Sequence, residues 1–138
     1  MKSSVNVEWQ NNMHFISNVN GINIHLDADE ASGGENLGPR PKPLLLTALG
    51  GCTGMDIVSI LKKMQVELEF FNVLVEGTSD EVHPKKFTSM HIVFELKGKN
   101  LNTEKVEKAI SLSMNKYCSV KATLENSVNI TFEYRIIE

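Results

Sequence analysis

The only two cysteines of this 138-residue chain are the residues best suited to chemistry, and each lies in a distinctive setting. Cys52 lies in the segment GGCTGMD at 50–56, inside a long apolar run, and Cys118 lies in KYCSV at 116–120, where a second amphipathic run ends. A thiolate is a nucleophile and exchanges with disulfides. A free cysteine also often packs as a small apolar side chain. The two thiols are therefore catalytic, redox-sensing or inert.

Composition and charge exclude several classes of protein. The net charge of −3 and the pI of about 5.8 give no basic footprint, so a nucleic-acid partner is not expected. The first residues lack the apolar core of a signal peptide, and we find no run of about 18 apolar residues, so no membrane partner is expected. The expected compartment is the cytoplasm, where thiols stay reduced unless they do redox work. The length predicts one domain, 1–138.

No cofactor or metal is expected from the motifs. The four histidines are scattered singly and show neither HxxxH nor CxxC spacing. Gly33-Gly34 does not follow a strand and open a helix, so it is not a phosphate cradle. Asp56, four residues after Cys52, shares its helix face and would raise a thiol pKa if it lay close. We expect Asp56 instead to bond a neighbouring element.

The N-terminal third predicts three strands and a long loop. Apolar and polar residues alternate over 5–9, 13–17 and 22–26, with turn residues between them, which indicates a hairpin followed by a third strand. The stretch Asp27–Pro43 is rich in Gly, Asp, Glu and Pro. It predicts a loop of about seventeen residues, a length that is uncommon unless the loop is functional or mobile.

A long helix should begin at Pro41 or Pro43 and run to Met64. It is apolar on nearly every side, so we expect it to be buried centrally. Three glycines around Cys52 cost roughly 1 kcal/mol each against alanine in a helix. That cost predicts the close approach of another backbone or helix.

The second half predicts two strands, a helix and a last strand. The strands cover 71–75 and 87–96, and the helix begins at Asn102 or Thr103 and ends at Cys118. The last strand covers 128–136. The resulting order, βββ-α-ββ-α-β, indicates an α+β fold in which strands can wrap two helices.

Two motifs carry a resemblance to a known family. The segment LLLTALGGCT at 44–53, followed by MDIV at 55–58, resembles the first cysteine motif of the OsmC/Ohr family, and YCSV at 117–120 resembles the second. The resemblance implies an OsmC-like fold, with strands wrapping two long central helices in an intertwined homodimer. It also implies a thiol peroxidase that reduces organic hydroperoxides without haem, flavin or metal. A dithiol or lipoylated protein is the reductant that the family implies.

The resemblance further implies a role for each thiol. Cys52 would be peroxidatic and form a sulfenic acid, and Cys118 would resolve it as a Cys52–Cys118 disulfide. Peroxidases of this family resemble one another in an arginine from the N-terminal strands, held by a glutamate that follows the proline before the first long helix. This chain has Lys42 in that place after Pro41, and neither of its arginines lies in those strands. Arg40 or Lys42 is therefore the candidate activating cation.

Three functions remain open from the sequence. The first is the cysteine-dependent peroxidase. The second is a redox-sensing or small-molecule-binding module with little turnover, which the missing arginine–glutamate pair favours. The third is an unrelated hydrolase such as a thioesterase, for which no Ser/His/Asp or paired-carboxylate arrangement is present.

Overall fold

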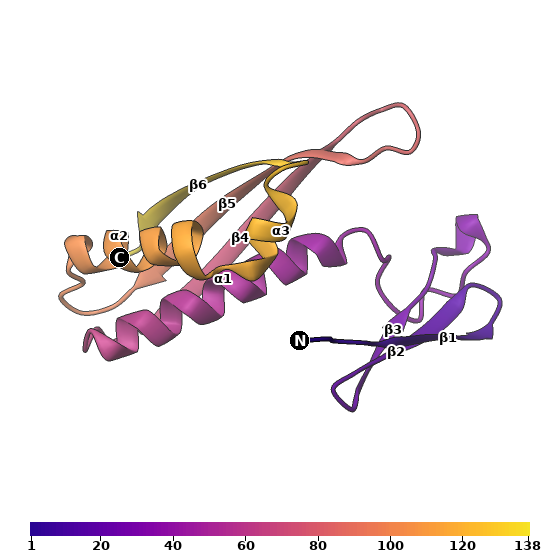
Figure 1. The fold of residues 1–138 in the computed structure, drawn as a ribbon, viewed down its shortest axis with the longest axis horizontal. Coiled ribbons are helices and arrows are strands. Elements are labelled where there is room, and N and C mark those ends of the chain that lie inside the picture. Colours follow the sequence, from indigo (N-terminus) through magenta and orange to yellow (C-terminus); the bar gives the residue numbers. More distant parts are fainter. The chain divides into compact units, whose positions relative to one another are not determined.

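The computed structural model describes all residues from Met1 to Glu138 and divides them into two compact units (Figure 1). The first unit is Met1–Leu45 and the second is Leu46–Glu138. We describe each unit by itself. The expectation that 1–138 forms a single domain stays a prediction.

The first unit contains the three predicted strands. They are β1 (Asn6–Asn11), β2 (His14–Val19) and β3 (Ile22–Leu26), and they form an antiparallel sheet in the order β1-β2-β3. Asn12 and Asn20 have positive φ values of 51° and 53° in the two turns. Asparagine tolerates this left-handed conformation better than most residues, which explains why the chain turns at these points.

The predicted loop after β3 is held by one buried carboxylate. Asp27 is only 3% exposed and accepts backbone N–H groups from Ala28 (2.7 Å), Glu35 (3.2 Å) and Leu37 (3.1 Å). Burial raises the pKa of Asp27, but these N–H donors outweigh burial and leave the pKa below its ordinary value. A short 3₁₀ turn, η1 (Glu30–Ser32), lies within the loop. The loop is therefore built around Asp27 rather than around an apolar cluster.

The second unit contains a mixed sheet. Its strands are β4 (Phe70–Ser79), β5 (Phe87–Lys97) and β6 (Asn129–Ile136), in the order β4-β5-β6. The β4–β5 pair is antiparallel and the β5–β6 pair is parallel. A parallel pair needs a crossover connection, and the helical segment between β5 and β6 provides it.

The helices of this unit lie on one face of the sheet (Figure 1). They are α1 (Leu44–Lys63), α2 (Thr103–Leu112) and α3 (Ser119–Leu124), with a single π-helical turn, Ser113–Tyr117, between the last two. Asn102 caps α2 by accepting the Lys105 N–H, as predicted. The core joins both long helices to the sheet through fully buried side chains, which include Leu49, Ile57 and Leu61 of α1, Ile92 and Phe94 of β5, and Val106 and Ala109 of α2.

Within the described chain, α1 is buried along one stripe only, so the expectation of central burial on every side is wrong here. Leu49, Ile57 and Leu61 are fully buried, whereas Met55 is 77% exposed and Val58 is 45% exposed. The reason is that the sheet and α2 cover a single side of the helix. By length and composition, α1 is long and apolar enough to cross a membrane, so the prediction that no segment is apolar enough is wrong. The core helix of a soluble protein meets the same criteria of length and composition. The absence of a membrane partner stays a prediction.

The glycines of α1 allow close packing against β4. A Cβ on Gly50 would lie 3.0 Å from Val75 Cγ2, and a Cβ on Gly54 would lie 3.3 Å from Val73 Cγ2. The predicted close approach is confirmed at these two positions, but the neighbours are strand side chains rather than a backbone or a helix. A Cβ on Gly51 would meet nothing within 4 Å.

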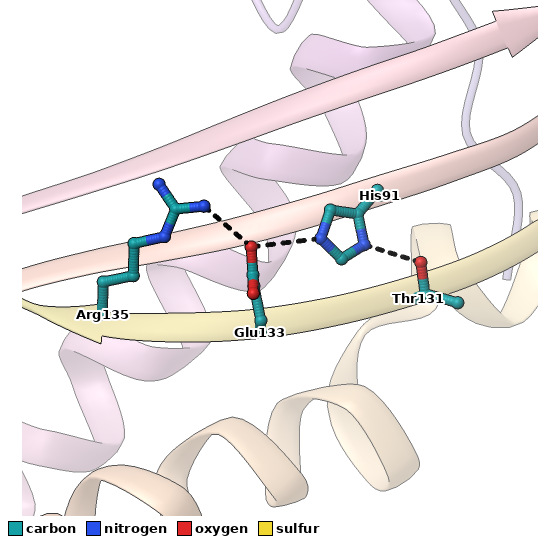
Figure 2. Close-up of polar contacts among 4 residues, drawn as sticks. All are labelled: His91, Thr131, Glu133 and Arg135. Carbon is teal, nitrogen blue, oxygen red and sulfur yellow. Dashed lines mark hydrogen bonds and ion pairs between the residues drawn. The ribbon is translucent and has the colours of Figure 1, made fainter.

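The other face of the sheet carries a polar network (Figure 2). His91 Nδ1 lies 2.7 Å from Thr131 Oγ1, and His91 Nε2 lies 3.5 Å from Glu133 Oε1, which also accepts a 3.0 Å hydrogen bond from Arg135 Nη2. Thr131, Glu133 and Arg135 alternate along β6 with residues such as Ile130 that pack toward the helices, and His91 lies opposite Thr131 on β5. Arg135 is therefore directed away from the helices that carry the cysteines.

Candidate functional site

Cys52 lies on α1 one turn before Asp56, so both side chains share one face of the helix. The preceding and following buried residues, Leu49 and Thr53, fix this part of α1 against the core, and the Thr53 hydroxyl bonds back to the Leu49 carbonyl oxygen at 3.0 Å. Cys52 itself is partly exposed. The first thiol is thus held on a rigid element and remains accessible.

Cys118 lies where the π-helical turn ends and α3 begins. Its backbone is extended (φ −72°, ψ 102°), and its N–H donates to the Ser113 carbonyl oxygen at 2.9 Å. Its Sγ caps α3 by accepting the Lys121 N–H at 3.3 Å. Cys118 is 4% exposed, so the second thiol is buried. The sequence predicts that the second helix ends here, which is confirmed, but it predicts neither the π-helical turn nor α3.

The structure brings the two predicted thiols together. Both cysteines are free, and their Sγ atoms lie within 4.8 Å of each other. A disulfide has an S–S length of about 2.05 Å, so bond formation needs the sulfurs to close by less than about 3 Å. The Ser119 hydroxyl oxygen lies 3.8 Å from Cys52 Sγ. Side-chain rotation and a small shift of the α3 start are movements of the required size.

The surroundings shift the pKa values of the two thiols in opposite directions. Burial by itself raises the pKa of the Cys52 thiol. Hydrogen bonds from the Val120 N–H, the Cys118 thiol and the Ser119 hydroxyl lower this pKa, and the Asp56 carboxylate raises it. The net result is a Cys52 pKa below its ordinary value of 9.0. Burial and the neighbouring Cys52 raise the pKa of Cys118 to about 11. The first thiolate to form is therefore Cys52.

Asp56 bonds the element that carries Cys118. Its Oδ2 accepts a 2.9 Å hydrogen bond from the hydroxyl of Ser113, which is fully buried. The expectation that Asp56 bonds a neighbouring element is confirmed. A carboxylate oxygen of Asp56 also lies within 4.8 Å of both cysteine sulfurs. Sequence reasoning missed the roles of Ser113, which continues the register of α2, and Ser119, which begins the short helix α3, because nothing in the sequence marks a polar contact to α1 at either position.

Cavities flank this site in the second unit. One of about 420 Å³ opens beside Asp56. Its remaining lining is mixed, with Ser59, Ile60, Lys63, Leu112 and Tyr117. Another of about 440 Å³ lies along the preceding turns of α1, between Gly50, Gly51 and the valines of β4. A small molecule therefore has room beside Asp56, and neither of these two cavities is lined by a cysteine.

The candidate cations Arg40 and Lys42 belong to the first unit. The Arg40 guanidinium donates to the carbonyl oxygens of Asp27 (3.0 Å) and Gly38 (2.8 Å) and to Asn36 Oδ1. These bonds give Arg40 a clear structural role in the loop. Activation of Cys52 by Arg40 or Lys42 stays a prediction.

The family model described as "OsmC-like protein" matches residues 33–133. Protein YhfA of Escherichia coli (strain K12) is 34% identical over 132 residues, which cover 95% of this chain and 96% of YhfA. A hypothetical protein from Aquifex aeolicus VF5 is similar in structure, with a TM-score of 0.83 and 32% identity over the whole of both chains. The organic hydroperoxide resistance protein OhrB of Bacillus subtilis has a TM-score of 0.63 at 17% identity, with 98% of each chain covered, which shows the shared fold alone. The predicted α+β fold and the predicted resemblance are confirmed.

Proposed function

Since the chain belongs to the OsmC-like protein family, we propose that it reduces organic hydroperoxides through its two cysteines. The observation that carries the proposal is the thiol pair, with an accessible Cys52 of lowered pKa within 4.8 Å of a buried Cys118. A thiolate next to a second thiol is the arrangement that two-cysteine peroxide chemistry needs. The choice of organic hydroperoxides follows from the fold relative OhrB, which is named an organic hydroperoxide resistance protein.

The reaction proceeds in two balanced steps. The Cys52 thiolate attacks the distal oxygen of the hydroperoxide, so an S–O bond forms, the O–O bond breaks and the alkoxide leaves and takes up a proton as the alcohol. The Cys52 sulfenic acid then condenses with the Cys118 thiol, so an S–S bond forms and water leaves. The hydroperoxide gains two electrons and the two thiols lose them. An external dithiol, small or on a lipoylated protein, returns the chain to its reduced state.

Hydrogen bonds supply part of the activation that the missing arginine–glutamate pair would give. The Val120 N–H and the Ser119 hydroxyl stabilise negative charge on Cys52 without a fixed cation. Cys118 keeps its proton because its pKa is about 11, so it can serve as the resolving thiol after Cys52 has been oxidised. A cytoplasmic homodimer is part of the same proposal.

The test is to mix the reduced chain with an organic hydroperoxide and count free thiols by mass spectrometry. We expect rapid loss of both thiols and a peptide pair joined by a Cys52–Cys118 disulfide. Cys52→Ser should lose all reaction, and Cys118→Ser should stop at a sulfenic acid that a dimedone-type reagent traps. Absence of the disulfide in the unmodified chain at saturating hydroperoxide would contradict the proposal.

A second candidate is a redox-sensing or ligand-binding module with little turnover. Asp56 favours it, because its carboxylate adds negative charge beside the thiol that must ionise. The same count of free thiols distinguishes this module from the peroxidase. A disulfide that forms slowly, together with no catalytic consumption of hydroperoxide when dithiol is supplied, is the result expected of the sensor.

A further inference from the structure

The Asp56 carboxylate has no role in the proposed peroxide chemistry. It lies beside the thiols, where its negative charge opposes thiolate formation at Cys52. Its bond to the buried Ser113 holds it in that position rather than letting it turn into solvent. The carboxylate is thus held within 4.8 Å of both sulfurs, and no ion pair to a lysine or arginine forms there.

The three side chains offer a metal ion a set of donors. Sγ of Cys52, Sγ of Cys118 and a carboxylate oxygen of Asp56 all lie within 4.8 Å of one another. In a tetrahedral zinc site, with Zn–S of about 2.3 Å and Zn–O of about 2.1 Å, neighbouring donor atoms are about 3.5–3.8 Å apart. The present donors therefore need to close by roughly 1 Å. Rotation of the side chains provides that movement.

We propose that the reduced site binds one Zn²⁺ ion through Cys52, Cys118 and Asp56. Thiolate sulfur and carboxylate oxygen are both ligands that zinc takes, and two thiolates favour it over magnesium or calcium. The protons of the two thiols pass to the buffer as the ion binds, so the three ligands and the ion together carry one negative charge. The sequence interpretation that excluded a metal depended on local spacing, whereas these ligands lie 66 residues apart in the chain.

The atoms around the donors fit this assignment. Ser113 bonds Asp56 Oδ2 and leaves the other carboxylate oxygen for an ion, and outer hydrogen bonds of this kind orient metal ligands. The Lys121 N–H already points at Cys118 Sγ at 3.3 Å, which suits a thiolate. With three protein ligands, a water molecule or the Ser119 hydroxyl takes the fourth position. Such an open site exchanges its ion more readily than a closed four-ligand structural site.

The consequence, which rests on the proposed function, is that zinc and hydroperoxide compete for the same two sulfurs. A zinc-bound Cys52 thiolate shares an electron pair with the metal, so it is a weaker nucleophile toward an O–O bond than the free thiolate. A Cys52–Cys118 disulfide has no thiolate left to bind the ion. Bound zinc would therefore slow the oxidation of both cysteines by hydroperoxide.

The experiment is a titration of the reduced full-length chain with Zn²⁺, without oxygen, against a chromogenic chelator. We expect one ion per chain, and a Co²⁺ titration should show thiolate-to-metal charge-transfer absorption. Cys52→Ser and Cys118→Ser should abolish that absorption, and Asp56→Asn should weaken zinc binding by tenfold or more. Asp80→Asn, in the β4–β5 turn, is the matched control and should leave binding unchanged.

Two results would overturn the zinc site. One is the absence of binding at micromolar zinc, and the other is zinc binding of unchanged affinity in Cys52→Ser and Asp56→Asn. His14 and His25, whose ring nitrogens lie 2.8 Å apart, are the alternative source of such binding, and the His14→Ala variant identifies it. The two proposals fail separately. A chain that binds zinc and ignores hydroperoxide contradicts only the peroxidase, and a chain that forms the disulfide and binds no zinc contradicts only the metal site.

Discussion

At the scale of single residues, the thiol pair is organised by hydrogen-bond donors. Burial raises the pKa of both cysteines, and only Cys52 receives enough donors to reverse the effect. Cys118 accepts the Lys121 N–H, yet its pKa rises to about 11, because it is buried and, to a smaller degree, because a second negative charge beside Cys52 is unfavourable. The two thiols therefore titrate as a coupled pair in which the exposed member ionises first.

Replacing Ser119 by alanine should make Cys52 less acidic. The Ser119 hydroxyl lies 3.8 Å from Cys52 Sγ and is one of the groups that lower its pKa, so its loss moves that pKa upward. The thiolate fraction at a given pH then falls, and the pH profile of Cys52 alkylation by iodoacetamide shifts to higher pH. Ser111→Ala, on α2, is the control with an unchanged profile. A profile that does not move in Ser119→Ala would show that the hydroxyl has no part in activation.

The sequence was sufficient to identify the two cysteines but not the polar contacts around them. Cys52 and Cys118 are the only thiols, and their motifs resemble those of one family, so the pair is visible without coordinates. Ser113 and Asp56 are 57 residues apart and meet because the end of α2 packs against α1, where the Ser113 hydroxyl lies 3.5 Å from the Thr53 carbonyl oxygen. The apolar period shows which face of each helix is buried but not how two helices align, so the contact could not be predicted.

At the scale of elements, α1 combines two kinds of glycine. Gly50 and Gly54 let the helix pack against the valines of β4, whereas Gly51 faces no atom within 4 Å. All three carry the entropic cost of glycine in a helix. The glycine cost is therefore offset by close packing against β4 at Gly50 and Gly54, whereas no contact in this chain explains the glycine at position 51.

Gly51→Ala should stabilise the chain by about 1 kcal/mol, because it removes the glycine cost and its Cβ enters open space. Gly50→Ala should gain less or lose stability, since its Cβ would lie 3.0 Å from Val75 Cγ2. Urea unfolding of both variants at one protein concentration measures the difference. Equal midpoints for the two variants would mean that contact with β4 does not distinguish the positions.

The strands and long helices could be predicted because each carries a strong period. The alternation over 22–26 matches β3, and the apolar run from 44 matches α1. Besides the π-helical turn, the elements that the sequence did not predict are η1 and α3, which are too short to repeat an apolar position. Side-chain caps stabilise these short helices instead: the side chain of Asp29 caps η1 and that of Cys118 caps α3.

At the scale of the whole molecule, the exposed side of α1 is the feature that a single chain leaves unexplained. Met55 (77% exposed) and Val58 (45% exposed) lie on a helix whose other side is fully buried. Apolar side chains gathered on one helix face are commonly covered by a partner. The homodimer that the family resemblance implies would cover them, and it remains a prediction.

Met55→Lys should convert the dimer to monomers with little effect on the fold of each chain. The side chain is exposed within the chain, so lysine meets water there, whereas in a dimer it would bury an unpaired charge against a second copy of α1. Light scattering coupled to gel filtration measures the mass, with 30.8 kDa expected for the dimer and 15.4 kDa for the monomer. Val82→Lys is the matched control, because Val82 is equally exposed at 77% but lies in the β4–β5 turn. If the unmodified chain runs as a monomer, or if Met55→Lys remains dimeric while circular dichroism shows it folded, this face of α1 is not the interface and its apolar side chains need another partner.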